Sequence, residues 1–258
     1  STQGVSSAAS DVYKRQGKIA TNDKVTISEN AASMGGSQMY LEPGEQHTVE
    51  ELLKGVIMAS ANDGAVALAE HLSGSVEEFV DDMNAKAAEM GLKNSHFVNT
   101  NGLPVAKHYS CAYDIGMICR QLMTYEFARD WFTAWQEDIK VGLPGKEKDF
   151  TLTNTNKMIR TYKGAIGGKT GFTQDAGYCL AEAAQRDSTR MIAVVLGCKD
   201  SKVRFAETAR LLDHGFASYE TVPVAKKGQK LRTITLPKSD QQEVAAVPEE
   251  TIAATVKK

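Results

Sequence analysis

Several features common in other classes of protein are scarce in this sequence. Its longest strongly apolar stretch, Met191 to Cys198, is far shorter than the ~20 residues that cross a bilayer. The formal net charge is only -2, with 30 Lys and Arg against 32 Asp and Glu, and the two signs are interspersed along the chain. We therefore expect no transmembrane segment here, and nothing favours a nucleic-acid partner.

Cysteine and histidine are too few and too scattered for a metal site or a disulfide framework. The four cysteines form no C-x-x-C pair, the five histidines never stand at i, i+4 spacing, and no His-Glu-x-x-His occurs. Those spacings are typical of zinc sites and of small disulfide-linked domains. We expect no metal, no cofactor, and buried free thiols at Cys111, Cys119, Cys179 and Cys198.

The length and composition suit a globular domain with a real core. The chain has 258 residues and 42% hydrophobic content, enough for one large domain or one domain plus part of another. Residues 1–16 resemble a translated cloning adaptor and lack the pattern of a secretory signal, so we predict a non-native or disordered tail. We expect the main domain at residues 17–218 and an incomplete C-terminal β domain at residues 219–258.

Helix-start signals and apolar spacing predict helices in the first half of the chain. Thr48 and Glu51 have the spacing of a capping box, and Ser75 and Glu78 repeat it before a helix that Gly91 ends. A third helix is predicted over residues 112–123, where apolar side chains recur on one face.

After Gln136 the pattern changes to short stretches rich in β-branched and aromatic residues, which predict strands. Residues 177–184 and 191–198 are apolar at nearly every position and flank a polar turn, so they predict an antiparallel hairpin buried on both faces. A final helix is predicted from Ser201 to about Ala217. The expected fold class is α/β in the α+β sense, an antiparallel sheet flanked by helices.

Two short motifs carry candidate chemistry. Ser60-Ala61-Asn62 lies where one helical pattern ends and another begins, so the plain alternative is that Asn62 is only a helix N-cap. Lys169-Thr170-Gly171 lies in a glycine-rich segment, but Lys163 stands where a phosphate-binding P-loop needs its first glycine. A strand pattern also follows Thr170, where a P-loop requires a helix.

Together these motifs match penicillin-recognising enzymes, which combine Ser-x-x-Lys with Ser-Asp-Asn and Lys-Thr-Gly. The sequence resembles the low-molecular-weight penicillin-binding proteins, the D-alanyl-D-alanine carboxypeptidases of serine peptidase family S11. The resemblance is collinear from about Gly17 to the C-terminus, and it is carried by these segments: Leu41-Glu42-Pro43-Gly44-Glu45, Ser60-Ala61-Asn62-Asp63, Asn101-Gly102-Leu103 and Gly168-Lys169-Thr170-Gly171-Phe172-Thr173.

The resemblance implies an acyl-enzyme reaction that removes the terminal D-Ala of a peptidoglycan stem peptide. It implies catalytic roles for Ser60 as a proton relay, for Asn62 as the group that orients the acyl side, and for Lys169 as a positive group hydrogen-bonded to Ser60. The implied substrate-binding residues are Thr170 and Arg204 for the terminal carboxylate, and Gly171 with the backbone N–H of Phe172 at the oxyanion hole. For Arg204 a solvated helix charge is the alternative.

The family's Ser-x-x-Lys motif, which would supply nucleophile and base, does not occur: no serine here has lysine three residues later. In the family this motif precedes the segment that resembles Asp23-Lys24-Val25-Thr26-Ile27. We therefore expect an N-terminally truncated member that also lacks the first strands of its sheet and is inactive in this form.

Two alternatives remain open. A class A β-lactamase-like hydrolase shares the motifs, but no glutamate here has asparagine four residues later, as its Glu-x-x-x-Asn pattern requires. A non-catalytic peptidoglycan-binding module would have kept the cleft without a nucleophile. The implied partners are stem peptides ending in D-Ala-D-Ala and β-lactam antibiotics, in the extracytoplasmic envelope of a bacterium, with a membrane anchor expected only in the full-length protein.

Overall fold

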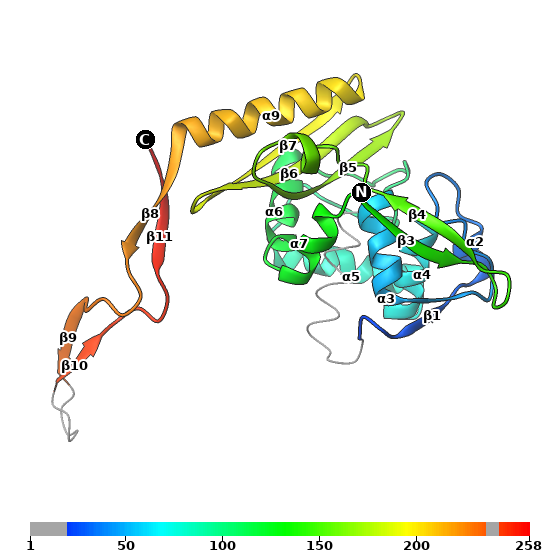
Figure 1. The fold of residues 1–258 in the computed structure, drawn as a ribbon, viewed down its shortest axis with the longest axis horizontal. Coiled ribbons are helices and arrows are strands. Elements are labelled where there is room, and N and C mark those ends of the chain that lie inside the picture. The colour runs from blue at the N-terminus through cyan, green and yellow to red at the C-terminus, as the bar shows by residue number, and fades with distance from the viewer. Residues whose placement is uncertain (1–19, 236–242) are drawn as a thin grey trace.

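Residues 20–235 and 243–258 are described by the computed structural model, which mixes helices and antiparallel strands (Figure 1). The predicted tail, residues 1–16, lies outside this part of the chain. The helices are α2 Glu29–Ala32, α3 Val49–Lys54, the π-helix η1 Gly55–Ala59, α4 Asn62–Ser73, α5 Val76–Glu89, α6 Ala112–Leu122, α7 Glu126–Thr133, α8 Met158–Thr161 and α9 Ser201–Ser218.

The strands form one three-stranded sheet and four two-stranded pairs, all antiparallel, within the described residues. The larger sheet has the order β5-β6-β7, and the pairs are β1 with β2, β3 with β4, β8 with β11 and β9 with β10. The bounds are β1 Lys24–Thr26, β2 Gln46–Thr48, β3 Gln136–Val141, β4 Lys148–Thr153, β5 Ala165–Thr173, β6 Gly177–Arg186, β7 Thr189–Cys198, β8 Tyr219–Ala225, β9 Arg232–Thr235, β10 Glu243–Ala246 and β11 Ile252–Lys257.

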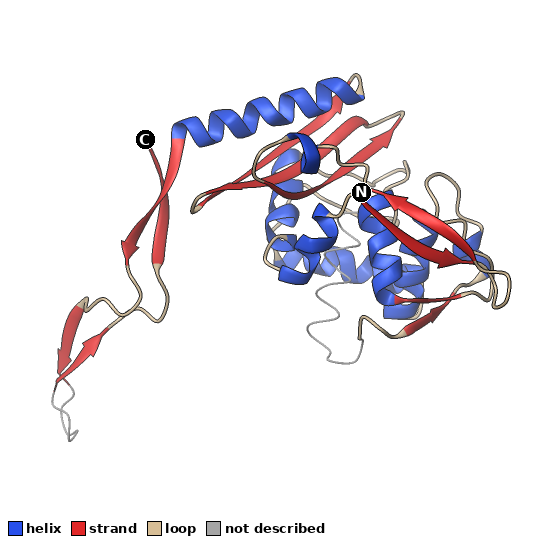
Figure 2. Ribbon diagram, viewed as in Figure 1, coloured by secondary structure: helices blue, strands red, loops and turns tan. Residues whose placement is uncertain are grey.

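The sheet β5-β6-β7 lies between two helical layers. Helix α9 packs along one face and α6 and α7 pack on the other, with α3, α4 and α5 beyond them (Figure 2). Alternate residues of β6 enter two cores: Leu180 and Ala184 pack toward α9 with Leu212 and Phe216, whereas Ala181 and Ala183 join the larger helical core. Because side chains alternate across a strand, this confirms that β6 is buried on both faces.

The predicted helix starts are confirmed. Thr48 and Glu51 form a reciprocal capping box at α3, and the Ser75 hydroxyl accepts the backbone N–H of Glu78 at the start of α5. The predicted hairpin is also present, but its strands extend further and leave only Asp187 and Ser188 as the turn. The short helices α2, α7 and α8 and the pair β1-β2 were not predicted, since segments of three to eight residues carry little periodic signal.

The cysteines are free, as predicted, but only Cys119 is buried, and Cys111, Cys179 and Cys198 are partly exposed. The prediction of four buried thiols is therefore wrong. Cys179 lies on β6 where the strand borders a cleft, and Cys111 is the N-terminal cap of α6. Both side chains are therefore in partial contact with solvent.

Residues 219–235 and 243–258 form two separate strand pairs beyond the end of α9, extending away from the sheet (Figure 1). Many of their apolar side chains are exposed, among them Val224, Leu231 and Ile252. The division into domains at residue 218 stays a prediction.

Candidate active site

The π-helix η1 places Ser60 at the edge of a cleft. Its extra residue per turn ends in a left-handed Ser60, with φ 60 and ψ 36, and the N–H of Ala61 bonds back to the carbonyl of Gly55 at 3.2 Å. A left-handed conformation is unfavourable for a non-glycine residue, and both π-turns and such strained residues concentrate at functional sites. We call η1, Ser60 and Asn62, together with residues 35–41, the helical wall of the cleft.

Asn62 begins α4, but its side chain does not cap the helix. The Asn62 amide Nδ2 donates to the carbonyl of Gly35 at 2.7 Å, and its backbone N–H donates to the carbonyl of Ser37 at 2.8 Å. The position before it, Ala61, is the N-cap residue and makes no side-chain bond. The alternative that Asn62 is only an N-cap is therefore wrong, and its amide lies against the cleft.

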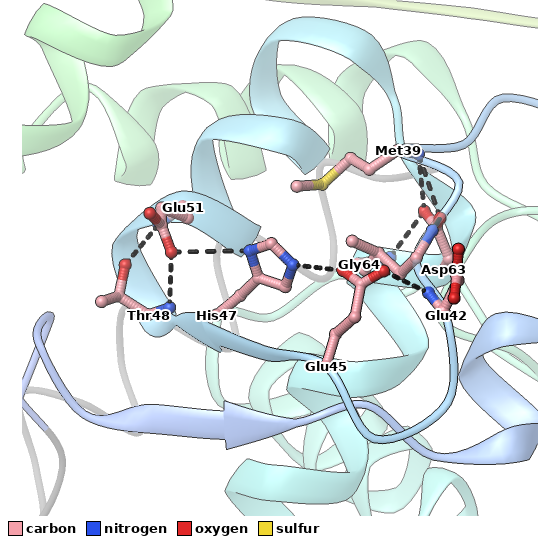
Figure 3. Close-up of polar contacts among 9 residues, drawn as sticks. Met39, Glu42, Glu45, His47, Thr48, Glu51, Asp63 and Gly64 are labelled. Carbon is pink, nitrogen blue, oxygen red and sulfur yellow. Dashed lines mark hydrogen bonds and ion pairs between the residues drawn. The ribbon is translucent and has the colours of Figure 1, made fainter. Parts of the chain in front are cut away.

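Buried carboxylates hold the loop of the helical wall (Figure 3). Asp63 is 1% exposed and accepts the backbone N–H groups of Met39 at 3.0 and 3.1 Å and of Leu41 at 3.2 Å. Glu45, also buried, accepts the N–H of Glu42 at 2.8 Å and hydrogen-bonds Nε2 of His47 at 2.8 Å. These bonds fix the segment that carries Gly36 and Ser37 into the cleft.

Strand β5 carries Lys169 into the cleft opposite Ser60. The ammonium Nζ donates to Oγ of Ser60 and to the carbonyl of Thr170, the latter at 3.1 Å. Lys169 is 4% exposed, and no carboxylate among the described residues pairs with it. Burial, and then the nearby positive charge of Arg204, lowers the pKa of Lys169 to about 7, so it can hold or release a proton near neutral pH.

Thr170 follows Lys169 and is 7% exposed. Its Oγ1 lies 2.6 Å from Oγ1 of Thr155. Phe172 extends into solvent, 54% exposed, with its ring 4.3 Å from that of Tyr178 between centroids. We call β5 with Arg204 the sheet wall of the cleft.

Arg204 projects from the first turn of α9 and is buried, 7% exposed. It donates to the carbonyls of Gly171 at 3.3 Å and Cys179 at 3.4 Å, and its guanidinium lies 5.4 Å above the Tyr178 ring. Burial lowers the pKa of Arg204. The alternative of a solvated helix charge is therefore wrong.

The two walls enclose a cleft of about 1230 Å³, and all seven predicted site residues border it. The predicted approach of Ser60 and Lys169 is present. The Ser60 hydroxyl is bonded to the Lys169 amine, which titrates near neutral pH, so it can relay a proton. The Thr170 hydroxyl and the buried Arg204 guanidinium can bind an anion.

Three polar residues beside β5 were not predicted from the sequence: Thr155, Asn156 and Glu182. Asn156 and Glu182 are fully buried, and Asn156 Nδ2 donates to Glu182 Oε2 at 2.6 Å. Burial raises the pKa of Glu182 to about 8. The only sequence signals were asparagine at the alternate positions 154 and 156, and the charged Glu182 inside the apolar run of residues 177–184.

Within the described residues, no group of three or more His, Cys, Asp or Glu side chains is arranged to hold a metal ion. In the same part of the chain, no helix combines the length and apolar character needed to cross a membrane.

Comparison with protein families gives one match, to the family described as D-alanyl-D-alanine carboxypeptidase, over residues 10–200. The chain is 44% identical over 243 residues to D-alanyl-D-alanine carboxypeptidase DacF of Bacillus subtilis (strain 168), covering 94% of this chain and 62% of that protein. It is 34% identical to DacC of Escherichia coli (strain K12), covering 88% and 57%. The chain thus spans about three fifths of the length of these relatives.

Solved structures of a penicillin-binding protein and of a DD-transpeptidase share the fold of this chain. Penicillin-binding protein 5 from Haemophilus influenzae superposes with a TM-score of 0.84 at 32% identity, covering 100% of this chain and 74% of that one. The Streptomyces K15 DD-transpeptidase superposes with a TM-score of 0.77 at 30% identity, covering 84% and 87%.

Proposed function

This chain belongs to the D-alanyl-D-alanine carboxypeptidase family, and on that premise we propose that its cleft binds peptidoglycan stem peptides ending in D-Ala-D-Ala for removal of the terminal D-Ala. The observation that carries the proposal is the hydrogen bond from the buried Lys169 ammonium to Ser60. In the bacterial envelope, outside the cytoplasm, both stem peptides and β-lactam antibiotics would reach this cleft.

Ser60 and Lys169 serve proton transfer in this proposal. Lys169, with its pKa lowered to about 7, exchanges a proton with the Ser60 hydroxyl, which relays it toward the leaving amine. Asn62, fixed by Gly35 and the start of α4, holds the amide on the acyl side of the peptide. A preorganised group of this kind needs no reorientation during the reaction.

Thr170, Arg204 and the chain around Gly171 bind the substrate. The Thr170 hydroxyl and the Arg204 charge hold the terminal carboxylate, since both residues border the cleft and Arg204 donates to the carbonyl of Gly171, next to Thr170. The backbone N–H of Phe172 contributes to the oxyanion hole.

Acyl-enzyme formation needs a nucleophile beside a base, and the 258 residues contain no Ser-x-x-Lys. We therefore propose that this chain binds penicillin reversibly and forms no covalent adduct. The test is incubation with fluorescent penicillin followed by denaturing electrophoresis and intact-mass measurement. A stoichiometric adduct that survives denaturation would identify an active serine within these residues and refute this part of the proposal.

A complementary experiment separates the enzyme from a non-catalytic peptidoglycan-binding module. A segment supplying Ser-x-x-Lys from a relative is joined ahead of Asp23, and D-Ala release from a D-Ala-D-Ala peptide is measured. The proposal expects release, with Lys169→Ala lowering the rate about 10²-fold or more. Folded chimeras that bind the peptide without releasing D-Ala would favour the module.

A further inference from the structure

Thr155 lies where the two walls of the cleft meet. Its backbone N–H donates to the carbonyl of Met58 in η1 at 3.0 Å, which ties it to the helical wall. Its hydroxyl lies 2.6 Å from that of Thr170 on β5, which ties it to the sheet wall. Thr155 also borders the cleft itself, next to Thr170.

Two buried asparagines fix the backbone on each side of Thr155. Asn154, 3% exposed, donates through Nδ2 to the carbonyls of Phe132 at 3.1 Å and Ala134 at 2.9 Å. Its Oδ1 accepts the N–H of Asn156 at 2.9 Å, so the amide closes a turn around Thr155.

Asn156 completes this arrangement from the other side. It is 0% exposed, donates to Glu182 on β6 at 2.6 Å, and accepts the N–H of Met158 at 3.1 Å. Because flanking side chains point into the protein, the side chain between them points out into the cleft. The backbone position of Thr155 is therefore set by buried hydrogen bonds, and its hydroxyl contacts that of Thr170.

The chemistry of hydroxyl groups decides what this contact does. Each threonine hydroxyl has one proton to donate, and an ionised carboxylate only accepts. Thr170 can therefore donate to a bound carboxylate only if its proton does not point at Thr155. The two hydroxyls at 2.6 Å share one hydrogen bond, so Thr155 must be its donor in the binding-competent arrangement.

We propose that Thr155 is a positioning residue, which donates to Oγ1 of Thr170 and so directs the Thr170 hydroxyl proton into the cleft, toward the terminal carboxylate of a peptide. This inference rests on the proposed function and makes it more specific. The cleft selects a free C-terminal acid through two cooperating hydroxyls and the Arg204 charge. A C-terminal amide, which is neutral and carries its own N–H donors, gains little from this arrangement.

The test measures the affinity of the 258-residue chain for N-acetyl-Lys-D-Ala-D-Ala as the free acid and as the C-terminal amide, by calorimetry or NMR titration. Thr155→Val keeps the shape and removes the hydroxyl, whereas Thr155→Ser keeps the hydroxyl. The matched control is Thr153→Val on β4, whose exposed hydroxyl accepts from Gln136 at 3.2 Å and does not border the cleft.

We expect Thr155→Val to weaken binding of the free acid about tenfold, as befits a hydrogen bond to a charged group, and to leave the amide nearly unchanged. Thr155→Ser should restore the preference for the free acid, and Thr153→Val should not alter it. Because Thr155 is exposed, the variants are expected to fold.

Equal weakening of acid and amide by Thr155→Val, or no recovery in Thr155→Ser, would show that Thr155 only supports the backbone and would overturn the inference alone. A wild-type chain that does not prefer the free acid, or binds neither peptide, would instead contradict the proposed function, and the inference would fall with it.

Discussion

Behind the helical wall, the buried carboxylates of Asp63 and Glu45 accept hydrogen bonds from backbone amides. In and behind the sheet wall, by contrast, Lys169, Arg204 and Glu182 lie buried without an ion-pair partner among the described residues. Burial is the largest cause that lowers the pKa values of Lys169 and Arg204 and raises the pKa of Glu182. A satisfied polar group stabilises a loop, but an unpaired buried charge costs stability.

The comparison assigns different tasks to the two regions. The helical wall uses its buried polar groups to hold a loop in one shape, so their loss should destabilise the fold. The sheet wall keeps charged groups poised for a ligand, so their removal should cost binding and spare stability. Substitutions of Asp63, Glu182 and Lys169 test this contrast.

The largest effect is expected at Asp63. Asp63→Ala leaves the backbone N–H groups of Met39 and Leu41 buried without their acceptor and should lower the free energy of unfolding by about 3–5 kcal/mol. Urea denaturation measures this change. Asp82→Ala is the control, because Asp82 is exposed and accepts from Ser73 alone among the residues that the structure describes. An equal loss there would remove the contrast.

Glu182 should give a pH-dependent effect. Its pKa is raised by burial from 4.5 to about 8, so between these pH values the folded chain keeps a proton that the unfolded chain has released. The free energy of unfolding should therefore fall as pH rises through that window. In Glu182→Gln, which keeps an acceptor for Asn156, this part of the slope should vanish.

The matched control for Glu182 is Glu220→Gln, at an exposed position on β8. Thermal unfolding midpoints from pH 4.5 to 8 provide the measurement. If Glu182→Gln and wild type show parallel pH profiles, Glu182 ionises in the folded chain as readily as in the unfolded chain. Its burial would then not cost stability, and the contrast between the two walls would fail at this residue.

The smallest effect is expected at Lys169. Lys169→Met replaces a buried, unpaired cation by an apolar side chain of similar length, so the free energy of unfolding should rise by about 1 kcal/mol. Binding of the free-acid peptide should be weakened at the same time. Lys140→Met, at an exposed site, should alter neither. A clear loss of stability in Lys169→Met would place this residue with the structural groups of the helical wall.

Local sequence was sufficient for the elements that carry their own signals. The capping residues Thr48 and Ser75 marked two helix starts, and two apolar runs marked the hairpin β6-β7. The motifs with Ser60 and Lys169 identified candidate residues because the family combines those residue types. In each case the information lies within a few neighbouring positions.

Tertiary structure alone decided how the site is assembled. Ser60 and Lys169 are 109 positions apart, and only the packing of η1 against β4, and of both η1 and β5 against α7, brings them into contact. Contacts between distant segments also set the direction of the Asn62 side chain and the burial of Arg204. They likewise determine the hydrogen-bond partners of Thr155, Asn156 and Glu182. Hydrogen bonding and burial between distant segments leave no periodic pattern in the chain, so sequence determined the candidate residues and the fold determined their geometry and charge.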